Sequence, residues 1–139
     1  MAGVEGSVPA RGRPARVLAV DDDPSFLALL CDVVDASREL ELVGETDCGE
    51  RAVQAAAKLR PDVVLMDVRM PRLDGISATT RIKAGLPSTL VVLVSVTHPD
   101  ELRREASGCG ASAILWKADL RPSLLDEIWR RHVEAVPSA

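Results

Sequence analysis

Short runs of apolar residues recur along this chain, and segments with helically spaced apolar residues lie between them. Apolar runs of this length predict buried strands, whereas the spaced segments predict amphipathic helices. Five strands are expected, over residues 16–20, 40–45, 63–66, 90–94 and 113–116. Five helices are expected, over residues 24–36, 50–59, 76–84, 100–107 and 123–135. Apolar strands that alternate with helices are typical of an α/β fold, in which helices cover both faces of a parallel sheet.

Residue types at several segment ends predict the local structure there. Asp23 suits the N-cap of the first helix, and Pro24 suits its first turn, where a backbone N–H group has no helical partner. The pair Cys48-Gly49 predicts a turn before the second helix. Asp74 is expected to be a structural turn residue in the loop before the third helix.

Length and composition limit the classes of protein to consider. The chain has 139 residues, of which 47% are hydrophobic and 27% charged, as in an ordinary globular domain. The net charge of −4 argues against non-specific nucleic-acid binding, which needs a basic surface. No apolar run approaches the ~20 residues of a membrane helix, and the N-terminus lacks the apolar segment of a secretory signal. We therefore expect a cytoplasmic protein that binds neither membranes nor nucleic acid.

One domain is expected, from residue 16 to residue 135. Residues 1–15 are rich in Gly, Pro and Ala and have no apolar period, which predicts a disordered leader. Residues 136–139 are expected to form a short C-terminal tail. The three cysteines form no CxxC pair, so we expect small buried thiols rather than a metal site.

Four of the expected strands end in polar or charged residues. In chain order, these residues are Asp21 with Asp22, Asp67, Ser95 and Lys117. The carboxyl ends of parallel strands lie at the same edge of the sheet, where open α/β folds bind their ligands. We therefore expect three carboxylates, a hydroxyl and an ammonium group to converge there.

The charges of this cluster indicate what it binds. Two carboxylates about 5 Å apart repel by roughly 3 kcal/mol at an effective dielectric constant of ~20. Lys117 supplies one positive charge, and a divalent cation would supply two more. A site with oxygen ligands and without His or Cys favours Mg²⁺. Taken singly, each residue has a simpler interpretation as a helix cap, a turn residue or a solvated lysine, and only their convergence at one sheet edge indicates a binding site.

The same residues resemble the receiver domain of bacterial response regulators, over about residues 16 to 133. The resemblance rests on short motifs in a fixed order, namely Val20-Asp21-Asp22-Asp23-Pro24, Asp67-Val68-Arg69-Met70-Pro71, Leu73-Asp74-Gly75, Ser95 and Lys117. The segment Gly110-Ala111-Ser112-Ala113, and Ala118 after the lysine, are most similar to receivers of the NarL/LuxR type. The family implies a flavodoxin-like fold with five parallel strands in the order 2-1-3-4-5.

The resemblance also implies a role for each residue at the sheet edge. Asp67 is implied to accept a phosphoryl group from a phosphohistidine on a sensor histidine kinase. Asp22, Asp67 and the backbone carbonyl of Arg69 are implied to hold Mg²⁺, with Asp21 acting on the metal through a water molecule. The remaining members, Ser95 and Lys117, are implied to contact phosphoryl oxygens. Phosphoryl transfer of this kind depends mainly on positioning and charge neutralisation.

Three residues bear on how such a site would be read out and how long it would stay modified. Ile114 stands where receivers usually carry Tyr or Phe, and Trp116 shares its face of the strand. We hypothesise that a signal passes through a repacked surface of the fourth helix, fifth strand and fifth helix; ordinary core packing of Ile114 is the alternative. In the family, Arg69 and Thr97 flank the path of the attacking water and tune the lifetime of the phosphorylated state. Arg69 could equally be an exposed residue paired with a nearby acid.

Residues 118–139 are too few for a helix-turn-helix domain. The sequence therefore fits either a stand-alone receiver or the receiver of a longer regulator with an output domain, and it leaves homodimerisation open. We expect no enzymatic activity beyond self-catalysed phosphotransfer and autodephosphorylation. One alternative is a phosphatase with an aspartyl nucleophile, but such enzymes want a second acid where Arg69 stands. The other is a pseudo-receiver that binds partners without being phosphorylated.

Overall fold

Five parallel strands form the central layer, in the order β2-β1-β3-β4-β5. In this computed structural model, residues 13–135 are described. The strands are β1 (Ala15–Val20), β2 (Leu40–Thr46), β3 (Val63–Asp67), β4 (Leu90–Ser95) and β5 (Ala113–Trp116). All four neighbouring pairs are parallel, with Val20 beside Met66 and Asp67 beside Val94. The α/β fold and the strand order expected from the sequence are confirmed.

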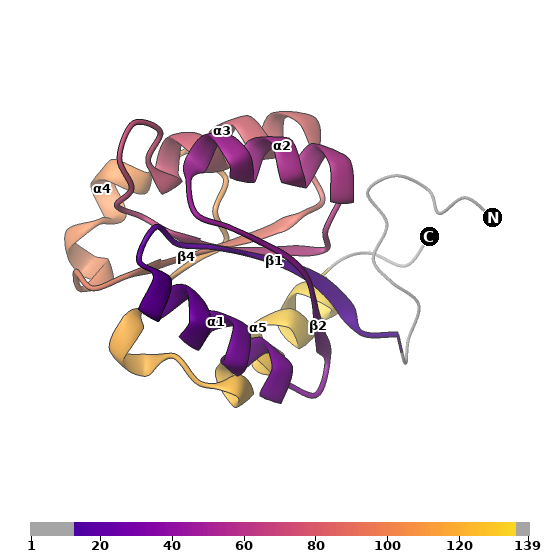
Figure 1. The fold of residues 1–139 in the computed structure, drawn as a ribbon. Helices are drawn as coiled ribbons and strands as arrows, with labels where there is room; N and C mark the ends of the chain where they lie inside the picture. The colour runs from indigo at the N-terminus through magenta and orange to yellow at the C-terminus, as the bar shows by residue number, and fades with distance from the viewer. Residues whose placement is uncertain (1–12, 136–139) are drawn as a thin grey trace.

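Helices cover both faces of this sheet, with α1 and α5 on one side and α2, α3 and α4 on the other (Figure 1). Their bounds are α1 (Pro24–Ala36), α2 (Gly49–Leu59), α3 (Gly75–Gly85), α4 (Arg103–Ala106) and α5 (Pro122–Ala135). Two short 3-10 turns, η1 (Pro99–Glu101) and η2 (Lys117–Asp119), complete the elements of the described residues.

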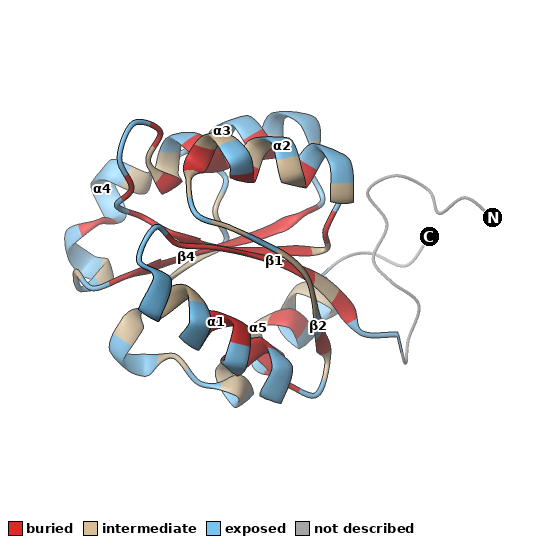
Figure 2. Ribbon diagram, in the orientation of Figure 1, coloured by how far each residue is buried: buried red, intermediate tan, exposed pale blue. Residues whose placement is uncertain are grey.

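The alternation of strand side chains divides the core into two apolar clusters. On β3, Val63 and Leu65 pack with α1 and α5, whereas Val64 and Met66 pack with α2 and α3. All residues of β3 and β4 are buried (Figure 2). Such strands read as continuous apolar runs because both of their faces are covered.

Asp126, a buried residue of α5, links this helix to the connection between α1 and β2. Its two carboxylate oxygens accept hydrogen bonds from the backbone N–H groups of Arg38 and Glu39, at 3.0 and 2.9 Å. These N–H groups follow the end of α1, so Asp126 holds α5 against the α1–β2 connection. No sequence pattern indicated this contact.

At the starts of the helices, the structure agrees with the sequence prediction at one position and differs from it at two. Asp23 caps α1 by accepting a hydrogen bond from the Ser25 backbone N–H group at 3.0 Å, as expected. Asp74, expected in a turn, is instead the N-cap of α3 and accepts from Ser77 N at 2.8 Å. Gly49, expected in a turn, is the first residue of α2. A Cβ atom at Gly49 would lie 2.2 Å from the Leu73 carbonyl oxygen, so the helix start packs directly on that loop.

The segment expected to be one helix over 100–107 is the largest difference from the sequence prediction. It contains η1 followed by the four-residue helix α4, and neither has a buried residue. Leu102, between them, is the buried anchor of this segment. With one apolar anchor and many charged side chains, the segment has no stripe that would stabilise a longer helix.

The ends of the chain bear on the domain boundaries expected from the sequence. Strand β1 begins at Ala15, whose backbone N–H group bonds to the Glu39 carbonyl at 2.8 Å, so Ala15 belongs to the sheet rather than to the expected leader. The rest of that leader up to residue 12, and the expected tail 136–139, lie outside the described residues. Among residues 13–135, no helix is long and apolar enough to cross a bilayer.

Candidate functional site

Three carboxylates meet at the carboxyl edge of the sheet, as the strand ends predicted. Asp21 follows β1, Asp67 ends β3, and these two strands are neighbours. One carboxylate oxygen each from Asp21, Asp22 and Asp67 can be chosen so that all lie within 4.8 Å of one another. Asp21 is fully buried and Asp67 is 6% exposed, whereas Asp22 is exposed.

Lys117 supplies the positive charge of the cluster. It follows β5, and its Nζ lies 3.0 Å from Oδ2 of Asp21 and 3.1 Å from Oδ1 of Asp67. The same Nζ lies 4.0 Å from the centroid of the Phe26 ring, which contributes a cation–π contact from α1. The sequence predicted the lysine at this site but gave no indication of Phe26.

The pKa values of Asp67 and Lys117 describe the electrostatics of the cluster. Burial raises the pKa of Asp67 to about 6; the hydrogen bond from Lys117 opposes this shift, and the charges of Asp21 and Asp22 add to it. Burial lowers the pKa of Lys117, but its bonds to Asp21 and Asp67 outweigh that effect and raise it overall. One ammonium group therefore faces three carboxylates, and the excess negative charge favours a bound cation.

The donor set fits Mg²⁺. All three side chains offer carboxylate oxygens, the ligands that hard divalent cations prefer. Both oxygens of Asp21 already accept hydrogen bonds, Oδ1 from Asp23 N at 2.9 Å and Oδ2 from Lys117. Asp21 is therefore less available for direct coordination than Asp22 and Asp67.

Ser95 lies at the same edge, one strand away from Asp67. It is the last residue of β4 and is 1% exposed, and the preceding residue Val94 pairs with Asp67. Its Oγ accepts a hydrogen bond from Thr97 N at 3.0 Å, which leaves the hydroxyl proton free to be donated. Thr97 itself follows β4, in the loop that leads to η1.

Gly75 lies directly behind Asp67 and was not predicted to contribute to the site. A Cβ atom at this position would lie 2.1 Å from the Asp67 carbonyl oxygen. The Gly75 N–H group also donates to the Val68 carbonyl at 2.8 Å. The glycine in Leu73-Asp74-Gly75 therefore permits α3 to begin against the backbone of Asp67.

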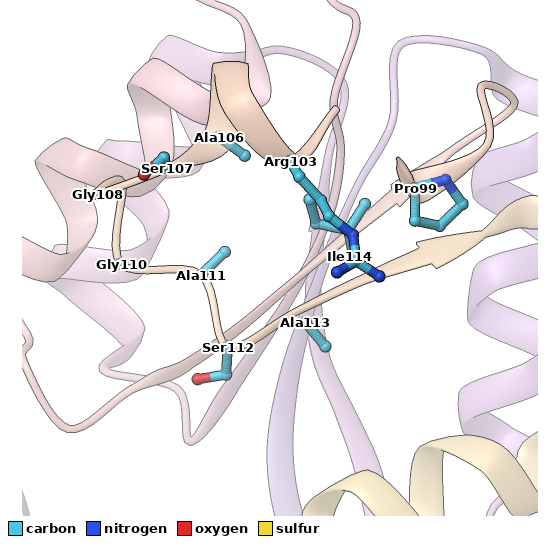
Figure 3. Close-up of a pocket in the computed structure, with 10 residues that line it drawn as sticks. All are labelled: Pro99, Arg103, Ala106, Ser107, Gly108, Gly110, Ala111, Ser112, Ala113 and Ile114. Atoms are coloured by element: carbon cyan, nitrogen blue, oxygen red, sulfur yellow. The ribbon is translucent and has the colours of Figure 1, made fainter. Parts of the chain in front are cut away.

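Ile114 and Trp116 lie on β5 with different surroundings. Ile114 is half-buried and packs against the apolar cluster of α2 and α3. Ile114 and Arg103 line an open hollow of about 480 Å³ between β5 and α4 (Figure 3). Trp116 is partly exposed, donates from Nε1 to the Val96 carbonyl at 3.0 Å and packs edge-on against His98. The readout role expected for Ile114 stays a prediction.

Arg69 forms an ion pair with an acid, one of the two interpretations that the sequence allowed. Its guanidinium donates to both carboxylate oxygens of Glu105, at 2.7 and 2.9 Å. The Glu105 partner lies on α4, 36 residues away in the sequence, and no sequence pattern identified it. The influence of Arg69 and Thr97 on the lifetime of a phosphorylated state stays a prediction.

The fold and the acidic edge define a class of protein, an open α/β module with a carboxylate cluster and a lysine at its strand ends. Residues 17–128 match the family model described as the response regulator receiver domain. The chain belongs to this family, as its motifs indicated.

Two curated relatives carry the name protein-glutamate methylesterase/protein-glutamine glutaminase. The protein from Myxococcus xanthus is 40% identical over 105 residues, which are 75% of this chain and 30% of that protein. The protein from Vibrio vulnificus is 35% identical over 121 residues, or 87% of this chain and 31% of that protein. This chain thus spans about a third of the length of the curated relatives that it matches.

Solved structures of receiver domains have the same fold. The receiver domain of the NarL regulator from Mycobacterium tuberculosis superimposes with a TM-score of 0.78 at 28% identity, covering 86% of this chain and 97% of that chain. The response regulator domain of Thermotoga maritima CheB superimposes with a TM-score of 0.76 at 32% identity, covering 90% and 100%. NarL-type receivers are thus among the structural neighbours, as expected, whereas the two curated relatives are methylesterases.

Proposed function

We propose that this chain is a phosphoacceptor domain of two-component signalling, in which Asp67 accepts a phosphoryl group from a sensor histidine kinase. The observation that carries the proposal is the position of the Asp67 carboxylate, buried between Lys117 and two further carboxylates at the sheet edge. A buried acid with a perturbed pKa, surrounded by charged groups, is typical of a functional site.

The reaction is an in-line transfer between two nucleophiles. A carboxylate oxygen of Asp67 attacks the phosphorus atom of the phosphohistidine, a new O–P bond forms, and the N–P bond breaks. The leaving histidine keeps the electron pair of that bond and takes up a proton. Apart from supplying the Asp67 nucleophile, the protein contributes mainly by positioning the groups and neutralising charge.

The metal site is assigned to the acids nearest the phosphoacceptor. Asp22, Asp67 and the backbone carbonyl of Arg69 are proposed as ligands of Mg²⁺, with Asp21 acting through a water molecule. The indirect role of Asp21 is supported by its two occupied oxygens, which accept from Asp23 N and Lys117 Nζ. When bound, Mg²⁺ neutralises negative charge on the phosphoryl oxygens and on the acids around them.

Ser95 and Lys117 are proposed to bind the transferred phosphoryl group. The Ser95 hydroxyl can donate to a phosphoryl oxygen while still accepting from Thr97 N. Lys117 Nζ already lies 3.1 Å from Oδ1 of Asp67, which places an ammonium group beside the carboxylate that would carry the phosphoryl group. The two residues would hold the group from strands β4 and β5, on one side of the acceptor.

The phosphorylated domain is proposed to signal in the cytoplasm, to a protein partner or to an output domain. Since the two curated relatives extend over about three times the aligned length, an output unit in a longer chain is consistent with the alignment. The proposal assigns no methylesterase activity to the receiver residues. The competing interpretation, a pseudo-receiver, is less well supported because the acids, the serine and the lysine are all present at the site.

Incubation with acetyl phosphate and Mg²⁺, followed by intact-mass measurement, tests the proposal. The wild type is expected to gain one phosphoryl group, and Asp67→Asn is expected to gain none. Asp47→Asn is the matched control, because Asp47 is an exposed acid paired with Arg51 and should leave the adduct unchanged. An adduct that persists in Asp67→Asn would place the acceptor elsewhere. If neither acetyl phosphate nor a phosphorylated histidine kinase labels the wild type, the pseudo-receiver interpretation is correct.

A further inference from the structure

An ion pair joins the loop behind the acidic cluster to α4. Arg69, two residues after Asp67, donates from Nη1 to Oε2 of Glu105 at 2.7 Å and from Nη2 to Oε1 at 2.9 Å. A guanidinium that contacts both oxygens of one carboxylate is held in a defined orientation. The contact therefore fixes where the Arg69 side chain points, and it does so from an element 36 residues away in the sequence.

This ion pair has more influence on the position of Arg69 than on overall stability. The side chains of Arg69 and Glu105 are 55% and 44% exposed, and exposed pairs contribute little to folding. Helix α4 has only four residues, none of them buried, and the buried residue Leu102 precedes it. Ala106 packs against the apolar core from α4, and the ion pair of Glu105 joins the same helix to the loop that follows Asp67.

Arg69 also follows the phosphoacceptor closely in the chain, because β3 ends at Asp67 and Arg69 is two residues further on. The hydrogen bonds that Arg69 donates to Glu105 are the main cause of the raised pKa of Arg69, and the charges of Glu105, Asp74 and Asp67 add to the shift. Lys117 is the cation that contacts Asp67 directly. Arg69 is thus a second cation near the site, committed in this structure to a different carboxylate.

A phosphoryl group on Asp67 would change the competition for this guanidinium. The phosphoryl group would carry up to about two negative charges on three acceptor oxygens, in place of the single charge of the Asp67 carboxylate, whereas Glu105 carries one charge. Arginine binds carboxylate and phosphoryl groups with the same forked geometry. The two acceptors therefore compete for one donor, and the more highly charged acceptor gains when Asp67 is phosphorylated.

Building on the proposed function, we infer that Glu105 is a positioning residue that withholds Arg69 from Asp67 until phosphorylation. Arg69 then leaves Glu105 and binds the phosphoryl group, and no covalent bond changes in this exchange. Helix α4 loses its link to the loop at the same moment. A partner that binds Glu105 in place of Arg69 would therefore favour the phosphorylated state. By linkage, the phosphorylated state would bind that partner more tightly by the same factor.

Binding of beryllofluoride, a phosphoryl mimic, in the presence of Mg²⁺ tests this exchange by isothermal titration calorimetry. Glu105→Gln removes the competitor, so it is expected to bind beryllofluoride roughly two- to fivefold more tightly than the wild type. Arg69→Gln is expected to bind more weakly than the wild type. In the double variant the gain from Glu105→Gln should disappear, because no guanidinium remains to be released.

Glu101→Gln is the matched control, since it removes the same charge from the exposed segment before α4 and leaves the Arg69–Glu105 pair in place. It is expected to bind like the wild type. A Glu105→Gln variant with wild-type affinity, or one with the same gain in the Arg69→Gln background, would overturn the inference. If the wild type itself does not bind beryllofluoride with Mg²⁺, the proposed function fails, which is a separate result.

Discussion

Asp67 lies in surroundings that disfavour its own charge. Burial and the neighbouring acids Asp21 and Asp22 raise its pKa, and the bond from Lys117 only partly offsets them. A site selected for stability alone would not gather three carboxylates around one ammonium group. The arrangement is explained if the missing positive charge arrives with a metal ion.

Replacing Asp67 by Asn is therefore expected to stabilise the metal-free protein. The pKa of Asp67 is 3.8 without perturbation and about 6 in the folded protein. As pH rises through this interval, the unfolded chain releases a proton that the folded protein keeps, so the wild type loses stability. Asp67→Asn is expected to be more stable by roughly 1–3 kcal/mol above pH ~7, and the difference should vanish near pH ~4.

Urea unfolding in EDTA at several pH values measures this difference. Asp47→Asn, at an exposed acid, is the control and should show no such pH-dependent gain. If Asp67→Asn is less stable than the wild type at neutral pH, the attraction between Asp67 and Lys117 outweighs the cost of burial and the repulsion from the neighbouring acids.

At the scale of the elements, the start of α3 is expected to control the geometry of the acceptor. A Cβ atom at Gly75 would lie 2.1 Å from the Asp67 carbonyl oxygen, so Gly75→Ala must displace either α3 or the end of β3. Overpacking of this kind is expected to destabilise by about 1–3 kcal/mol and to reduce phosphoryl uptake. Gly85→Ala, at the other end of α3, meets no atom within 4 Å and should be neutral or slightly stabilising.

Thermal unfolding and adduct yield should be measured for both alanine variants. If Gly75→Ala and Gly85→Ala have the same unfolding temperature and the same adduct yield, this result would contradict the close approach that the structure shows at Asp67.

The elements also show what the sequence could and could not predict. Strands β3 and β4 were predicted to within a residue because both of their faces are buried, which leaves an uninterrupted apolar run. The segment over 100–107 was predicted as one helix, whereas the structure has η1 and α4 with the buried residue Leu102 between them. Glu105 lies within the expected helix and within α4, but no pattern in the sequence pairs it with Arg69.

The sequence predicted those residues of the candidate site whose positions follow from the ends of the strands alone. Asp21, Asp22, Asp67 and Lys117 converge because parallel strands end at one edge, and this needs no knowledge of side-chain packing. Phe26 beneath the lysine and Gly75 behind the acceptor depend on how α1 and α3 pack against the sheet. Such contacts between distant segments leave no periodic signal in the sequence.

At the scale of the whole molecule, one sheet edge gathers the acids and the lysine, and the surrounding helices contribute further contacts to that edge. Two cations lie near Asp67: Lys117 contacts it directly, whereas Arg69 is held by Glu105 on the weakly packed helix α4. This division fits a domain in which modification at one residue changes the exposure of a nearby surface.

Locating the phosphoryl group in the chain shows directly whether Asp67 is the phosphoacceptor. After treatment with acetyl phosphate and Mg²⁺, borohydride reduction of the acyl phosphate followed by peptide mass spectrometry marks the modified residue. A single mark at Asp67 is expected, and it should be absent when EDTA replaces Mg²⁺. A mark on another residue, or one at Asp67 that forms equally well without the metal, would contradict it.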